Sequence, residues 1–184
     1  MIHIHKKLQP LFGETLRYID IFWMVFWLIL GHLLSFFVDQ NFYLLTPFRA
    51  FIFMILLTDL IAGAYINTTP SVMSYYDKHP TLIKYFPVIH IYPLIFMFLF
   101  DVSFLMVLIM YVTTTLFAYR TLTLVTYKNV FAWTVIMIGA FLFGLFEDGY
   151  SLSFALGMFL YVMKIVKVFS TRHYMACPVN LSKK

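Results

Sequence analysis

The chain has 184 residues, of which 62% are hydrophobic and 11% are charged, and its net charge is +5. Soluble domains are close to half apolar and one quarter charged, so this composition excludes an ordinary soluble domain. No basic tract is long enough to follow a phosphate backbone, so we expect no nucleic-acid partner. Because the apolar excess runs along the whole chain, residues 1–184 are predicted to form a single membrane domain.

Six apolar segments follow one another along the chain, and about 20 apolar residues in a helix are enough to cross the hydrocarbon of a bilayer. The sequence therefore predicts an all-α, polytopic integral membrane bundle. The six predicted transmembrane helices cover about residues 19–38, 48–66, 86–100, 102–119, 130–146 and 151–169. The stretch from Asn67 to Lys84 is the longest polar connection and is expected to be a loop.

The segment Phe86 to Tyr119 is ambiguous because it holds 34 residues and one charge, Asp101. A single helix of that length would be about 51 Å long, which exceeds what a bilayer needs. We predict two spans that turn near Asp101, and the alternative is one long span from about Tyr92. Pro87 and Pro93 further suggest that the third span is kinked or broken.

The charges alternate between the turns. Basic residues precede span one and lie between spans two and three, between spans four and five, and after span six: Lys6, Lys7, Arg17, Lys78, Lys84, Arg120, Lys128, Lys164, Lys167 and Arg172. The remaining turns carry Asp39, Asp101, Glu147 and Asp148, and only Arg49 lies near one of them. Cytoplasmic loops are enriched in Lys and Arg, so six crossings with both termini cytoplasmic are predicted, in a cell membrane more readily than in an internal one.

The end of span six is predicted to be an anchor. Lys164, Lys167 and Arg172 are spaced to share one helix face, from which long side chains can reach lipid headgroups. Tyr161 would add an interfacial aromatic anchor. We expect this face to orient the last helix without taking part in chemistry. Cys177 is the only cysteine, which excludes an intrachain disulfide.

Asp59 is the strongest candidate site residue, because it lies within span two and a carboxylate at that depth needs a partner or a task. Asp59, Gly63 and Asn67 are spaced four apart, so they share one helix face, which is expected to look into the bundle. The small Gly63 would let a neighbouring helix approach closely. The competing interpretation is a carboxyl held by hydrogen bonds to another span.

The other candidate ligand-binding residues are polar groups near Asp59 or at the end of span two: His32, His90, Asn67, Thr68, Tyr75 and Tyr76. Each of them could instead satisfy its own helix or loop. Two histidines and one carboxylate can hold a divalent metal, but nothing in the spacing requires it. The sequence contains no motif for a metal site or a catalytic nucleophile, so no metal, no cofactor and no catalytic residue are predicted.

Three functions remain open. The first is a protein that binds or transports a small molecule in an intramembrane polar cavity around Asp59, His32 and His90. The second is a membrane-embedded enzyme acting on a lipid or isoprenoid, which the small number of acidic residues disfavours. The third is a non-catalytic assembly or accessory protein whose polar residues hold helices together. Membrane lipids are the expected partners in all three, and the sequence does not indicate an oligomeric state.

Overall fold

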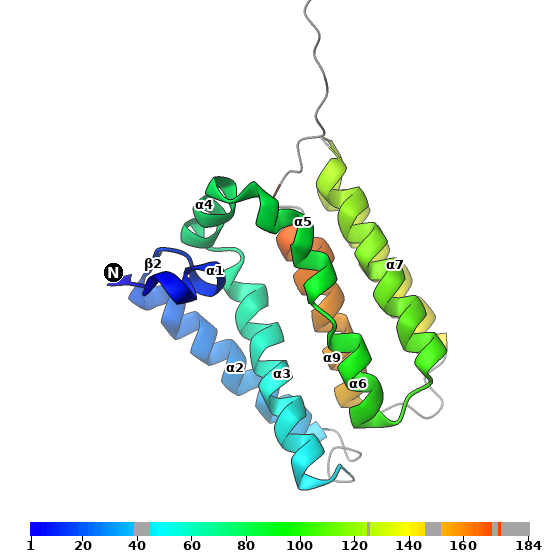
Figure 1. Ribbon diagram of the computed structural model, residues 1–184. Coiled ribbons are helices and arrows are strands. Elements are labelled where there is room, and N and C mark those ends of the chain that lie inside the picture. The colour runs from blue at the N-terminus through cyan, green and yellow to red at the C-terminus, as the bar shows by residue number, and fades with distance from the viewer. Residues whose placement is uncertain (39–44, 125, 146–151, 171–172, 174–184) are drawn as a thin grey trace, which may run out of the picture.

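A computed structural model gives the arrangement of the chain (Figure 1). It describes residues 1–38, 45–124, 126–145, 152–170 and 173, with the backbone alone for 38 and 140–145. The predicted turn residues Asp39, Glu147 and Asp148, together with Arg172 and Cys177, lie outside the described residues.

The described chain is almost entirely helical. A two-residue strand pair, β1 (Ile2–His3) and β2 (Thr15–Leu16), is antiparallel and encloses a 3-10 turn, η1 (Lys6–Leu8), and α1 (Gln9–Phe12). The longer elements are α2 (Tyr18–Val38), α3 (Pro47–Ile66), α4 (Pro70–Lys78), α5 (Pro80–Ile89), α6 (Tyr92–Phe100), α7 (Phe104–Thr123), α8 (Lys128–Leu145), α9 (Leu152–Val162) and the π-helix η3 (Met163–Phe169).

Among the described residues, five helical segments are long and apolar enough to cross a membrane. They are Tyr18–Phe37, Pro47–Ile66, Pro80–Phe100, Phe104–Thr123 and Leu152–Phe169. In α8 the part whose side chains the structure describes, Lys128–Gly139, is also apolar. The chain is therefore an all-helical membrane protein.

The connection between the second and third spans is helical rather than the polar loop expected from its composition. α4 fills half of it, and α5 begins at Pro80, six residues before the predicted start at Phe86. Pro70 and Pro80 each occupy a first helical turn, where a proline loses no hydrogen bond and its fixed φ suits a helix. The loop expectation was wrong because polarity was given more weight than these two helix starts.

The third span is broken, as the prolines predicted. α5 ends at Ile89 and α6 begins at Tyr92, so two residues are left outside regular helix. Tyrosines from α7 bind the carbonyl groups on the α5 side of the break: the Tyr111 hydroxyl donates to Val88 O at 2.6 Å, and the Tyr119 hydroxyl donates to Lys84 O at 2.5 Å. Irregular backbone at membrane depth is tolerated where protein supplies such partners.

The chain turns at Asp101, where the sequence predicted a turn. Asp101 ends α6 in the left-handed region, with φ 51°, which an Asp adopts more readily than most residues. Its carboxylate forms an ion pair with Arg49 at the start of α3, including a contact of 3.0 Å to Nη2. This guanidinium holds the pKa of Asp101 below its usual value. Arg49, which did not fit the charge pattern, is therefore neutralised by this acidic turn.

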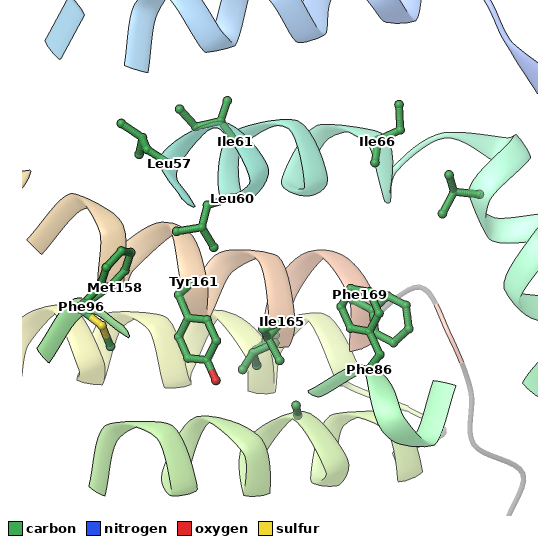
Figure 2. Packing of buried hydrophobic residues seen from close by; sticks show 14 of the residues in the cluster. Leu57, Leu60, Ile61, Ile66, Phe86, Phe96, Met158, Tyr161, Ile165 and Phe169 are labelled. Atoms are coloured by element: carbon green, nitrogen blue, oxygen red, sulfur yellow. The ribbon is translucent and has the colours of Figure 1, made fainter. Parts of the chain in front are cut away.

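The core lies between α3, α6, α7 and the α9–η3 pair. Figure 2 shows Leu60 of α3 above Tyr161 of α9, while Ile61 points to the opposite side, toward α2. α2 packs on α3 but leaves most of its own side chains exposed, so it is the peripheral helix of the group. A helix that is apolar on all sides suits this place, because its outer face meets lipid.

Candidate functional site

Asp59 has two partners from other spans. The Lys164 Nζ of η3 lies 2.7 Å from Asp59 Oδ2 and 3.3 Å from the Asp59 carbonyl oxygen. The Tyr92 hydroxyl of α6 donates to the same Oδ2. Lys164 Nζ also lies 3.5 Å from that hydroxyl and 5.2 Å from the centre of the Tyr92 ring. Three separate spans thus meet at one carboxylate, which is the arrangement expected from the competing interpretation of a carboxyl held by hydrogen bonds to another span.

The interpretation of Lys164 as a headgroup anchor was wrong. Its side chain is only 3% exposed and points into the bundle. A lysine side chain near the end of a span extends toward the lipid headgroups when no acidic partner lies closer. Here Asp59, at a similar depth in the bilayer, is such a partner. Tyr161 is not an interfacial anchor either, because it is fully buried. Lys167 lies nearer the surface, where its Nζ donates to Asn129 at 2.5 Å.

Local backbone features place these groups. Gly63 leaves the space that the Lys164 side chain occupies, since a Cβ there would lie 2.6 Å from Nζ and clash with Cε. Lys164 lies in the π-helical turn, a rare geometry that is often found at functional sites. Tyr92 is the first residue of α6, directly after the break in the third span. The close approach at Gly63, the π-helical turn and the break before Tyr92 therefore all lie at one ion pair.

The two charges differ in accessibility. The Lys164 side chain is 3% exposed, whereas that of Asp59 is 43% exposed. Among the described residues, the hydrogen bonds to the carboxylate all end on Oδ2, so Oδ1 remains available. A ligand would therefore meet the carboxylate first, and the ammonium group stands behind it.

His90 lies beside this site without binding Asp59. Its Nδ1 donates to Phe86 O at 2.5 Å, and its ring centre is 5.5 Å from that of Tyr92. The ring also packs on Phe86, which in turn stacks on Phe169 with ring centres 3.5 Å apart. His90 thus continues an aromatic column that covers one side of the ion pair.

His32 belongs to a different contact. Its Nδ1 lies 2.7 Å from Leu28 O, and its Nε2 lies 3.0 Å from the Thr58 hydroxyl and 3.2 Å from Met54 O. The contacts of Nε2 connect α2 to α3, whereas that of Nδ1 stays within α2. His32 therefore has its own hydrogen-bond partners, which are separate from those of Asp59.

The polar residues after α3 have partners other than Asp59. Asn67 is buried and ends α3, and the Thr68 hydroxyl donates to Tyr65 O at 2.6 Å. Tyr75 stacks on His79 with ring centres 4.3 Å apart. The Tyr76 hydroxyl donates to Pro10 O at 3.1 Å, and burial raises the pKa of Tyr76 to about 12. The structure does not gather these four side chains around Asp59.

Sequence reasoning missed Lys164 and Tyr92 as site residues. Asp59 lies seven residues before the end of α3, and Lys164 lies five residues before the end of η3. Opposite charges at similar depth in two spans that run the same way would have been a usable signal. Tyr92 carried no comparable signal, since it is one of 13 tyrosines.

Within the described residues, no three His, Cys, Asp or Glu side chains come together as a possible metal site. No protein-family model matches the chain. Comparisons with curated proteins and with solved structures also give no match. The geometry around Asp59 is therefore the basis for any functional proposal.

Proposed function

We propose that this protein binds a small molecule at Asp59 and carries it across the membrane. The observation that supports the proposal is the ion pair between Asp59 and Lys164, which is held inside the spans by a helix break and a π-helical turn. Ionisable residues within transmembrane segments are costly and usually mark binding sites or transport pathways. Broken helices are a recurrent feature of transporter binding sites.

The accessible charge indicates the chemistry of the ligand. Asp59 offers a half-exposed carboxylate with a free Oδ1, while Lys164 is enclosed. A protonated amine would therefore bind the carboxylate and compete with Lys164 for it. The ring of Tyr92 adds an aromatic face that favours a cation nearby. The ligand class that fits best is a small organic amine.

The topology that accompanies this proposal has six spans, with α8 as the fifth and both termini in the cytoplasm of a cell membrane. Contacts such as Lys78 with Glu14 and Lys128 with the carbonyl of His173 gather the basic connections at one end of the bundle. The opposite end carries the neutral pair of Arg49 and Asp101. Enrichment of basic residues at one end supports a cytoplasmic assignment for that end.

A binding experiment on the purified protein in detergent tests the ligand class. The probes are a primary alkylamine, a carboxylic acid and an alcohol of equal size, and the readout is the shift of the thermal unfolding midpoint. The amine is expected to raise the midpoint of the wild type and of Asp101→Asn, but not that of Asp59→Asn. The wild-type protein in vesicles should then take up the labelled amine. Binding of the acid alone, lost in Lys164→Gln, would overturn the assignment of an amine.

The assembly function is a second candidate, and one observation favours it. Lys164 connects α3, α6 and η3 through its bonds to Asp59 and Tyr92, as interhelical polar contacts in membrane bundles often do. If none of the probes binds and Asp59→Asn only weakens folding, the ion pair holds the bundle together and the transport proposal fails.

A further inference from the structure

Two pockets lie along the same side of α2, away from the ion pair. One is a polar pocket of about 310 Å³ at the start of α2, where α2 meets the N-terminal strand pair and α4. Its lining consists of Met1, Glu14, Thr15, Arg17, Asp20, Thr69, Pro70, Ser71 and Ser74. The other is an apolar groove, also of about 310 Å³, between α2, α3 and α9. Its lining consists of Trp27, Leu30, Gly31, Leu34, Ile61, Ala64, Tyr65, Leu156 and Leu160.

Tyr65 connects the two pockets. Its ring lines the apolar groove, and its hydroxyl lies 3.4 Å from Asp20 Oδ1 in the polar pocket. Asp20 and Trp27 are seven residues apart on α2 and so share one helix face, about 10 Å apart along the axis. In Figure 1 the start of α2 lies at the same end of the bundle as α4, and α2 runs from there alongside α3. The polar pocket therefore lies toward the membrane surface, and the groove extends from it into the hydrocarbon.

The polar pocket presents the partly free guanidinium of Arg17. Arg17 donates to Asp20 through Nε at 2.9 Å and through Nη2 at 2.8 Å, so in the described part of the chain its Nη1 is left without a hydrogen bond. The Arg17 side chain is 54% exposed. Hydroxyl groups line the wall beside it, including those of Ser71 and Ser74. A guanidinium with adjacent hydroxyl donors fits a phosphate group.

We infer that these two pockets together bind one phospholipid molecule, with its phosphate beside Arg17 and one acyl chain in the groove between α2, α3 and α9. The occupant follows from the surroundings: the groove faces hydrocarbon, whereas the pocket at its end is polar and lies among the basic connections. The groove has room for roughly ten groups the size of a water molecule, each taking about 30 Å³. It therefore holds part of an acyl chain, and the remainder lies in the bilayer.

Native mass spectrometry of the delipidated full-length protein tests this inference. The added probes are phosphatidylglycerol, diacylglycerol with the same chains, and inorganic phosphate. The wild type is expected to bind one phosphatidylglycerol at least tenfold more tightly than diacylglycerol, and to bind inorganic phosphate weakly. Ser74→Leu fills the polar pocket without breaking the Arg17–Asp20 pair, and should remove the preference for phosphatidylglycerol.

Ala64→Phe fills the groove and is expected to weaken both lipids about tenfold. Val112→Phe on the lipid-exposed face of α7 is its matched control and should change neither lipid. Arg17→Lys keeps a cation beside Asp20 and is expected to retain part of the phosphatidylglycerol preference, whereas Lys7→Gln outside the pocket should retain all of it. Equal binding of the two lipids by the wild type would overturn the inference, as would unchanged binding by both Ser74→Leu and Ala64→Phe.

Discussion

The ion pair between Asp59 and Lys164 gives the most direct test of the structure. Removing one partner of a buried pair typically costs about 3–5 kcal/mol, because the remaining charge is left uncompensated. Asp59→Asn leaves an ammonium group on a side chain that is 3% exposed, so this full cost is expected. Asparagine keeps the size of the side chain and an oxygen that accepts from Tyr92, which isolates the effect of the charge.

Lys164→Met is expected to cost less. The carboxylate left behind is on a side chain that is 43% exposed, and it keeps its hydrogen bond from Tyr92. A polar group in that situation costs on the order of 1–3 kcal/mol. The double variant Asp59→Asn/Lys164→Met contains neither charge and should lie within about 1 kcal/mol of the wild type, since apolar or neutral replacements of a whole buried pair are often tolerated.

The free energy of unfolding can be measured in mixed micelles with increasing SDS, followed by circular dichroism. The matched control is the pair formed by Arg49 and Asp101, whose side chains are 36% and 74% exposed. Its coupling is expected to be much smaller than that of the buried pair, as for other exposed pairs. The reasoning would be refuted if the double variant lost as much stability as both single variants combined, because the two charges would then be independent.

Three further predictions concern positions around the site and the ends of helices. Gly63→Ala should destabilise by about 1–3 kcal/mol in the same assay, because the new methyl group meets Lys164, whereas Gly139→Ala has open space and should be neutral or stabilising by up to about 1 kcal/mol. Burial holds the pKa of His173 below its usual value near 6.5, so the unfolded chain binds the proton first. The thermal midpoint should therefore fall as the pH drops from 7.5 to 5.5, and it should fall less in His173→Phe. Tyr127→Gly should stabilise by about 1 kcal/mol, since Tyr127 is 79% exposed and has a φ of 59°.

Each of these predictions has an opposite result that counts against it. Equal effects of alanine at Gly63 and Gly139 would mean that Lys164 does not occupy the space beside Gly63. A midpoint that does not change with pH, or one that changes equally in His173→Phe, would remove His173 as the titrating group. A loss of stability in Tyr127→Gly would show that the tyrosine ring contributes more than its backbone strain costs.

The helical membrane fold could be predicted because hydrophobic runs are a local property of the chain. The turn at Asp101 and the break near His90 could also be predicted, because a charge marks the turn and two prolines flank the break. The partners of Asp59 could not be predicted from local sequence in the same way. Lys164 lies 105 residues away, and its position near the end of an apolar run is equally consistent with a side chain that reaches the headgroups.

The polar cluster after α3 shows a second limit of local patterns. Thr68 and Tyr76 were grouped with Asp59 because they are close in sequence, but the Thr68 hydroxyl binds the carbonyl of Tyr65 three residues earlier, and the Tyr76 hydroxyl binds that of Pro10 in α1. Hydroxyl side chains often satisfy local backbone in this way, so their density alone does not indicate a ligand site. Asp59 differs from these residues because it lies within a span. Depth in the membrane was therefore a more informative criterion than closeness in sequence.

The separation between Asp59 and its partners also has a consequence for biosynthesis. Ribosomes add about 5–20 residues per second, so Lys164 is made roughly 5–20 s after Asp59. Tyr92 follows only 33 residues later and is made roughly 2–7 s after it. The Asp59 side chain therefore enters the bilayer well before its counter-charge exists. The hydrogen bond from the Tyr92 hydroxyl is therefore the first of the two contacts that can form, and the arrival of Lys164 completes the assembly of the bundle.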